Sequence, residues 1–72
     1  MAEQVRAEMV ANVMKVLVGA GDVVAPGDAV VILESMKMEI PVLVEHGGTV
    51  LAIDVHEGDV VQEGDVMVEV GE

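Results

Sequence analysis

The chain repeats an eight-residue stretch in related form. Gly21-Asp22-Val23-Val24-Ala25-Pro26-Gly27-Asp28 returns 37 residues later as Gly58-Asp59-Val60-Val61-Gln62-Glu63-Gly64-Asp65, and this repeat indicates how the chain folds. Between positions 13 and 33, nine of the twenty-one residues are identical at this offset. A valine-rich chain gives some valine matches by chance, but not two Gly-Asp pairs in register. The two halves therefore carry the same supersecondary unit.

Each copy of this unit predicts two strands linked by two tight turns. The glycines suit turn positions that need a positive φ, and the aspartates can hydrogen-bond to their own backbone there. Pro26 before Gly27 also favours a tight turn. The valine-rich runs on either side are typical of strands. We expect these strands at 13–18, 29–34, 50–55 and 66–70, with a short Val-Val piece between the turns of each copy.

Alternation with a period of two predicts which side chains point into the barrel. The residues expected to face inward are Val5, Ala7, Met9, Ala29, Val31, Leu33, Ile40, Val42, Val44, Leu51, Ile53, Val55, Val66, Val68 and Val70. Those expected to face outward are Val30, Ile32, Ala52, Asp54, Met67 and Glu69. With Leu17, outward Val30 and Ile32 would form an apolar partner patch, unless a bulge breaks the alternation and places them in the core.

These rows add up to about eight short strands in two related halves, and no segment has a helical period. The predicted fold class is an all-β flattened barrel or sandwich with approximate two-fold symmetry. At 72 residues the chain has room for one domain. The absence of Phe, Tyr, Trp and Cys leaves a core of interdigitated branched residues, with no aromatic-lined pocket, disulfide or thiolate. Such a chain is a poor candidate for an enzyme with a deep cleft.

The charge is strongly acidic, with fourteen Asp and Glu against three Lys and Arg and a formal net charge of −11. This surface repels phosphate backbones and anionic lipid, so we expect neither nucleic-acid nor membrane binding. The acidic residues keep an apolar small protein soluble. The alternative interpretation is that they serve docking on basic partner enzymes. No signal-peptide pattern or long apolar run occurs in the chain, so we expect a cytoplasmic protein.

The repeat also predicts where Lys37 lies. Under the 37-residue shift Glu34 falls on Gly71, so the segment 34–39 corresponds to the gap between the chain ends. The termini should then meet at one end of the barrel, and a hairpin carrying Lys37 should form the other. Met36 and Met38 flank the lysine, where an ordinary tight turn prefers Gly, Asn, Asp or Pro. The alternative is a merely solvated lysine whose neighbouring methionines fill the barrel end.

The segment Glu34-Ser35-Met36-Lys37-Met38-Glu39-Ile40-Pro41-Val42 resembles the attachment motif of biotinyl domains, the biotin carboxyl carrier family. The resemblance extends over essentially the whole chain, including the Gly-Asp turns and the Gly47-Gly48 turn. In the sister lipoyl domains the lysine usually follows Asp and precedes Ala or Val, so the two methionines point to biotin. The resemblance implies a flattened barrel of two four-stranded antiparallel sheets, in agreement with the repeat.

By this resemblance, biotin is joined covalently to Lys37 by a biotin protein ligase, which reads Glu34, Met36, Met38 and Glu39. The carrier then serves a biotin carboxylase and a carboxyltransferase of an acyl-CoA carboxylase-type system. Ser35 departs from the Ala of many members, and the chain has neither the thumb insertion of some carriers nor an Ala/Pro-rich linker. We therefore expect residues 1–72 to form one biotinyl domain, a free-standing monomeric carrier without catalytic activity.

Two alternatives to the biotin carrier stay open. A lipoyl carrier or an unmodified interaction module would share the same fold. An enzyme is the weakest reading, because His46, His56 and Ser35 form no acid–base or nucleophile set. A metal site is not expected: the acid pairs Glu57/Asp59 and Glu63/Asp65 lack the ligand spacing of a calcium loop.

Overall fold

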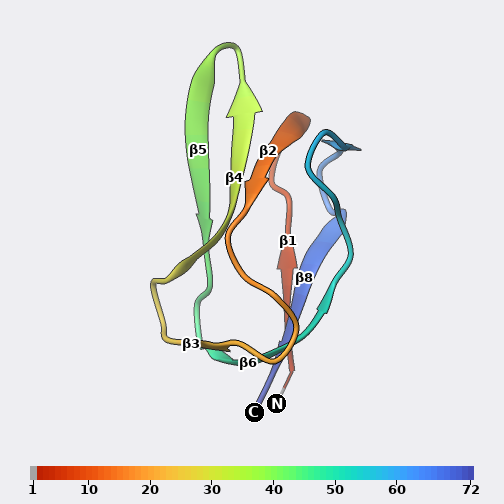
Figure 1. Cartoon of the computed structure of the whole chain (residues 1–72). Coiled ribbons are helices and arrows are strands. Elements are labelled where there is room, and N and C mark those ends of the chain that lie inside the picture. Colours follow the sequence, from red (N-terminus) through yellow and green to blue (C-terminus); the bar gives the residue numbers. More distant parts are fainter. Residues whose placement is uncertain (1) are drawn as a thin grey trace.

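The computed structural model describes residues 2–72, which form eight strands and no helix (Figure 1). The strands are β1 (Glu3–Arg6), β2 (Ala11–Val16), β3 (Val23–Val24), β4 (Ala29–Ser35), β5 (Met38–Leu43), β6 (Gly48–Ile53), β7 (Val60–Val61) and β8 (Val66–Gly71). They build an elongated body of 34 × 17 × 17 Å. The described chain contains no helix long and apolar enough to cross a membrane.

The strands form two four-stranded sheets in which all paired neighbours are antiparallel, in the orders β1-β8-β6-β3 and β5-β4-β2-β7. A shift of 37 residues maps β1–β4 onto β5–β8, and it also maps the first sheet order onto the second. The predicted fold class and its two-fold symmetry are therefore confirmed. The chain ends lie together, since Glu3 pairs with Val70, and the β4–β5 hairpin lies at the opposite end of the molecule (Figure 1).

Two strands begin two residues earlier than the sequence predicts. Ala11 and Asn12 pair with the short strand β7, and Gly48 and Thr49 pair with the short strand β3. The Val-Val pieces between the turns are thus ladder partners of the opposite half. This exchange of short strands extends β2 and β6 towards their N-terminal ends.

The four Gly-Asp turns share one hydrogen-bonding pattern. In each turn a carboxylate oxygen accepts a bond of 2.8 Å from the backbone N–H three residues earlier. The four carboxylates are those of Asp22, Asp28, Asp59 and Asp65, and the preceding glycines have φ between 89° and 95°. A side chain with a Cβ is strained at such a φ, which explains why glycine recurs. The predicted role of both residue types is confirmed.

The first turn of each half is clamped onto the other half. The Gly21 N–H donates to the Val50 carbonyl at 2.8 Å, and the Val50 N–H donates back to Asp22 at 2.8 Å. The symmetric pair joins Gly58 and Asp59 to Val13, at 2.8 and 2.7 Å. Each half therefore supplies a strand residue that hydrogen-bonds to the first turn of the other half.

The core between the sheets is aliphatic. It consists of Val5, Ala7, Ala11, Val13, Val24, Val30, Val31, Leu33, Val44, Val50, Val55, Val61, Met67, Val68 and Val70. Among residues 2–72 no buried side chain is polar or charged. Mostly valine side chains, with Leu33, Met67 and two alanines, thus fill this interior without aromatic rings.

The predicted alternation is wrong at Val30, Met67 and Leu51. Val30 and Met67 are fully buried, whereas Leu51 is 57% exposed. Each is the extra residue of a β-bulge, because the pairing passes from Val31 to Ala29, from Val68 to Val66 and from Val50 to Ala52. A bulge leaves one residue unpaired and reverses the alternation beyond it.

Met9 is also exposed, contrary to prediction, because β1 ends at Arg6. The other residues expected to face inward are buried or half-buried. Of the predicted apolar patch, Val30 belongs to the core, while Ile32 is half-buried and Leu17 is exposed. The patch therefore persists without Val30.

The N-terminal strand is latched to the loop after β5. The carboxylate of Glu3 accepts hydrogen bonds from the backbone N–H groups of Glu45 at 2.8 Å, His46 at 3.0 Å and Gly47 at 3.3 Å. Burial alone would raise the pKa of Glu3, but these three donors and the charge of His46 outweigh it and lower the pKa. The ionised carboxylate is thus the form that the fold prefers.

The close approach of β6 to β8 yields a first prediction. A Cβ at Gly48, whose φ is 134°, would overlap the carbonyl oxygen of Gly71. Gly48→Ala should therefore lower the free energy of unfolding in urea by about 3 kcal/mol or more. Gly58 is the control, because it has a φ of 95° and no atom within 4 Å of its Cβ position. Gly58→Ala should cost about 1 kcal/mol, and equal losses in both variants would contradict the close-approach explanation.

The Glu3 latch yields a second prediction, about pH. A lowered pKa in the folded state stabilises the protein above the pKa of the unfolded glutamate, and this contribution disappears as the pH falls through the folded value. Glu3→Gln should therefore be less stable than the wild type at pH 7. The difference should shrink as the pH falls below about 4.3, the ordinary pKa of a glutamate. Urea unfolding between pH 7 and pH 3 measures it, and a pH-independent difference would contradict the latch.

Candidate cofactor attachment site

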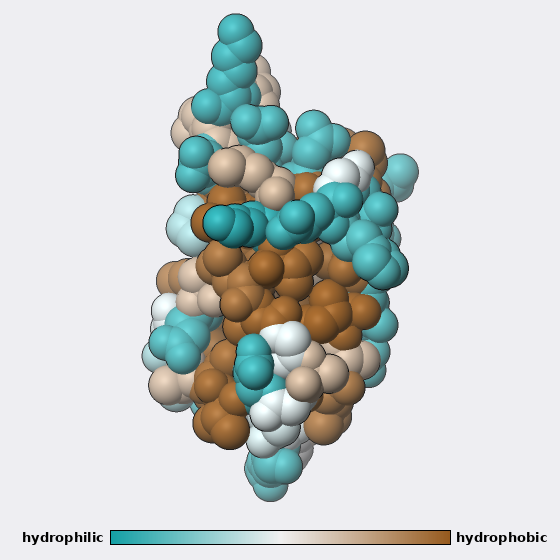
Figure 2. Space-filling view, viewed as in Figure 1, coloured by the Kyte–Doolittle hydropathy of each residue, from teal (hydrophilic) through white to brown (hydrophobic). Residues whose placement is uncertain are grey.

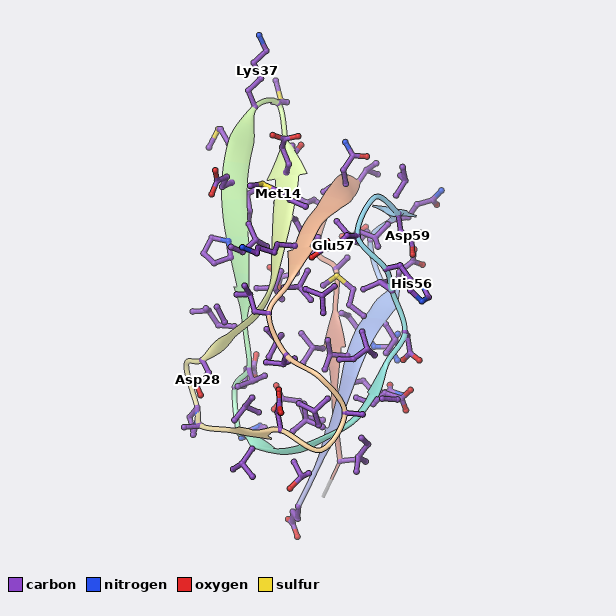
Figure 3. All side chains as sticks on the ribbon, viewed as in Figure 1. Met14, Asp28, Lys37, His56, Glu57 and Asp59 are labelled. Atoms are coloured by element: carbon purple, nitrogen blue, oxygen red, sulfur yellow. The ribbon has the colours of Figure 1, made fainter. Side chains whose placement is uncertain are left out.

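The predicted site residues lie on the β4–β5 hairpin, which projects beyond the rest of the barrel (Figure 1). Ser35 pairs with Met38 as the last ladder pair, so Met36 and Lys37 form a two-residue loop. Figure 3 shows the Lys37 side chain pointing away from the body at the extreme end of the molecule. The structure thus brings Glu34, Met36, Lys37, Met38 and Glu39 together, as the sequence predicts.

Both loop residues have left-handed backbones, with φ of 54° at Met36 and 66° at Lys37. Two positive φ values are typical of type I′ hairpin turns, for which Asn-Gly is the usual sequence. In the described part of the chain, these are the non-glycine residues with positive φ. The left-handed conformation costs roughly 1–2 kcal/mol for each such residue. Backbone strain of this kind is typical of functional sites, so the loop is a candidate functional site.

The methionines do not fill the barrel end. Met36 is 91% exposed and Met38 is 64% exposed, so the packing alternative from the sequence is wrong. Lys37 is exposed as well, and within residues 2–72 no hydrogen bond or ion pair holds its ammonium group. An accessible and unpaired amine of this kind fits a covalent attachment point, because nothing in the fold has to move before it reacts.

Glu34 and Glu39 face each other across the hairpin. They are a directly opposite cross-strand pair, and both are exposed. Like charges in this arrangement destabilise a sheet. In the described chain neither carboxylate has an ion-pair partner. The tip is therefore a cation between exposed methionines above two uncompensated carboxylates.

Sequence reasoning did not identify two features of this tip, the left-handed turn and the Glu34–Glu39 pairing. Placing the turn at Met36-Lys37 would have predicted both. Counting outward from those two residues pairs Ser35 with Met38 and Glu34 with Glu39, as observed.

The other polar residues singled out by the sequence lie away from the hairpin. His56, Glu57 and Asp59 lie to the right of the hairpin strands and below the hairpin tip in Figure 3. Asp59 and Asp65 already accept turn hydrogen bonds, and Glu57 accepts one from the Val16 N–H at 3.2 Å. No group of three or more His, Asp or Glu with metal-binding geometry exists within residues 2–72.

Two shallow hollows of about 340 Å³ each open on the surface. One is an apolar groove lined by Val16, Val18, Ile53 and Val55 with His56 and Glu57. Figure 2 shows hydrophobic surface gathered in the middle of the face presented there. The other hollow is rimmed by Asp54, Asp59 and Asp65. Neither includes a hairpin residue, so the candidate site is an exposed tip and not a pocket.

Comparisons with known proteins agree with this geometry. The model of the biotin/lipoyl family, described as "Biotin-requiring enzyme", matches residues 3–70. The chain is 55% identical to the biotinylated protein TB7.3 homolog of Mycobacterium leprae over 93% of this chain and 94% of that protein. It is 50% identical to the biotin/lipoyl attachment protein of Bacillus subtilis, over 86% and 85% of the two chains.

Larger proteins contain a similar segment. The chain is 40% identical to part of the biotin-dependent acyl-coenzyme A carboxylase alpha3 subunit of Mycobacterium leprae, covering 94% of this chain and 11% of that subunit. The urea carboxylase of Kluyveromyces lactis superposes with a TM-score of 0.92 at 34% identity. That superposition covers 99% of this chain and 6% of the urea carboxylase. The whole chain therefore matches small portions of these larger carboxylases.

The strained tip yields a third prediction. Replacing Met36 by Asn and Lys37 by Gly places the preferred residues at both left-handed positions. The double variant Met36→Asn, Lys37→Gly should raise the free energy of unfolding by about 1–2 kcal/mol. Lys15→Gly is the control; it lies within β2, where glycine should cost about 1 kcal/mol. Urea unfolding measures both, and a double variant less stable than the wild type would contradict the strain.

Proposed function

Because the chain belongs to the biotin/lipoyl attachment family, whose model covers residues 3–70, we propose that it is a biotin carrier whose cofactor is joined to Lys37. The family resemblance predicted from the sequence is confirmed by this match. The description of the family as biotin-requiring agrees with the predicted cofactor. The chain is also related to part of an acyl-CoA carboxylase subunit, which supports a carrier role in carboxylation.

The observation that carries the proposal is the exposed lysine on a strained two-residue loop. Lys37 is the basic residue of the tip, and the fold accepts two left-handed non-glycine residues to present it. Exposed Met36 and Met38 and the paired Glu34 and Glu39 surround it. We assign these four side chains to recognition by a biotin protein ligase.

Lys37 supplies the nucleophile for attachment. Its amine must first lose a proton, which an exposed position permits. The neutral amine attacks the carboxyl carbon of biotin, activated by the ligase as an acyl adenylate, and AMP leaves as the amide forms. The reaction removes the positive charge of the tip and changes the formal net charge from −11 to −12. The strands β4 and β5 hold the amine clear of the barrel so that an enzyme can enclose it.

The remaining function of the chain is to position what it carries. When bound, the cofactor supplies a ureido nitrogen that accepts a carboxyl group at a biotin carboxylase and releases it at a carboxyltransferase. Docking of the carrier makes the second encounter intramolecular, with an effective concentration of order mM for a short flexible tether. The chain itself acts without catalysis, as a cytoplasmic monomer in this proposal.

A fourth prediction tests the attachment residue. Lys37→Arg should carry no biotin after incubation with a biotin protein ligase, biotin and ATP, because a guanidinium is not an acyl acceptor. Its free energy of unfolding should stay within about 0.5 kcal/mol of the wild type. Lys15→Arg, the matched control, should still take up one biotin. Intact mass spectrometry measures both.

Biotin on the Lys37→Arg variant, for example at Lys15, would contradict the assignment. A lipoyl mass on the wild-type protein would instead favour the lipoyl carrier of the same fold. Unmodified wild-type protein would leave an interaction module as the function of the hairpin.

A further inference from the structure

The internal symmetry allows each surface position to be compared with a counterpart in the same backbone setting. The hairpin sheet (β5-β4-β2-β7) corresponds strand by strand to the terminal sheet (β1-β8-β6-β3) under the 37-residue shift. Even the bulges correspond, since Met14 and Leu51 are both skipped by the pairing and both exposed. Differences between the two outer faces therefore do not come from demands of the fold.

At four positions the outer face of the hairpin sheet is apolar where that of the terminal sheet is polar. The contrast is reversed at one position, because Lys15, which pairs with Ile32, corresponds to Ala52. Ile32 pairs with Pro41 on the hairpin sheet, and at the equivalent place Glu69 pairs with Gln4. The residues Leu17, Ile32, Pro41 and Leu43 correspond in this order to Asp54, Glu69, Gln4 and Arg6. All eight are exposed or half-buried. We call Met14, Leu17, Ile32, Pro41 and Leu43 the Ile32 face.

The Ile32 face is continuous with the attachment site. Along β4 and β5, the Ile32–Pro41 pair is followed on the same side by the Glu34–Glu39 pair, and then by the tip. Single exposed apolar residues are ordinary on a protein surface. An apolar face that replaces polar residues at four equivalent positions, and that leads to the reactive lysine, points to an interaction surface.

We propose that the Ile32 face is the docking surface for the ligase that modifies Lys37. This proposal rests on the proposed function. The unmodified lysine has only its own four-carbon side chain as reach. The ligase must therefore close over the hairpin and contact β4 and β5 beyond the tip. Enzymes that act on the loaded carrier reach the biotin ring at the end of the extended biotinyl-lysine side chain, so they do not need to contact β4 and β5.

The chemistry of the face defines its partner. An apolar patch on the ligase covers Ile32, Pro41 and Leu43, while flexible Met14 adapts to its shape. Lys15, the neighbour of Ile32 on β2, adds one cation to this face, which an acidic or carbonyl group of the ligase can meet. Cationic groups of the ligase lie opposite Glu34 and Glu39, since those carboxylates repel each other and have no ion-pair partner in the described chain. The net charge of −11 steers such a basic surface towards the carrier.

The symmetry also supplies the test variants. Leu17→Asp with Leu43→Arg installs the residues found at the equivalent positions, and it leaves the net charge at −11. Both side chains are substantially exposed, Leu17 at 42% and Leu43 at 51%. Met14→Ser tests the face singly, and Leu51→Ser is its counterpart on the terminal sheet. Initial rates of biotinylation by a purified biotin protein ligase give kcat/KM, while urea unfolding reports the fold.

We expect kcat/KM to fall about tenfold or more in the double variant, as for loss of interface hot spots. It should fall measurably in Met14→Ser and stay within about twofold in Leu51→Ser. Wild-type rates in the folded double variant would overturn the docking surface and leave the proposed function intact. If the double variant does not fold, the test is the comparison of kcat/KM between Met14→Ser and Leu51→Ser. Equal values in these two variants would overturn the docking surface.

Two further outcomes would overturn the proposal. Normal ligation of the double variant, combined with slow carboxylation after loading, would assign the face to a carboxylase instead. Failure of the wild-type protein to accept biotin would overturn the proposed function, and the docking surface with it.

Discussion

Hydrogen bonds between the Gly-Asp turns of each half and the strands of the other half hold the barrel together. Gly21 and Asp22 bond to Val50, while Gly58 and Asp59 bond to Val13, so the backbone of each half is held by the other. The second pair of turns repeats the arrangement, with Gly27 bonded to Val44 at 2.9 Å and Gly64 to Ala7 at 2.8 Å. These bonds fix the register of the strands around a core without aromatic rings, where shape alone would specify the packing weakly. A domain of 72 residues thus obtains its uniqueness from polar turns.

The proposed attachment site lies where the two-fold symmetry is broken. At one end the chain termini interrupt the barrel, and at the other the β4–β5 hairpin continues past it. Six residue pairs join β4 and β5 below the Met36-Lys37 turn. The pairing of these strands offsets the conformational free energy that the two left-handed residues cost. The same hairpin carries the outward side chains Ile32, Pro41 and Leu43, whose counterparts in the other half are polar. The proposed attachment and docking sites therefore share one structural element, which the symmetric half does not duplicate.

The repeat predicted the eight strands, the meeting of the termini and the position of Lys37, because a 37-residue offset with Gly-Asp turns in register leaves little freedom in topology. Alternation failed where a bulge decides the orientation. Val30 and Met67 are buried and Leu51 is exposed because each is the extra residue of a β-bulge, where strict alternation breaks. The position of a bulge depends on tertiary packing, which the alternation of residues along the sequence does not report. The repeat contains a signal for the burial of these two residues. Val30 and Met67 occupy equivalent positions and are both apolar, as expected for core residues, whereas the next equivalent pair, Ile32 and Glu69, differs in polarity, as expected for surface residues.

The proposed role of this barrel is to present one lysine for biotin. It is tested most directly by intact mass spectrometry of the protein purified from cells that express it natively, with fragmentation to locate any modification. The account predicts a single added biotin, with loss of one water, on Lys37. A lipoyl group at that position, biotin on Lys15, or an unmodified chain in biotin-replete cells would contradict it.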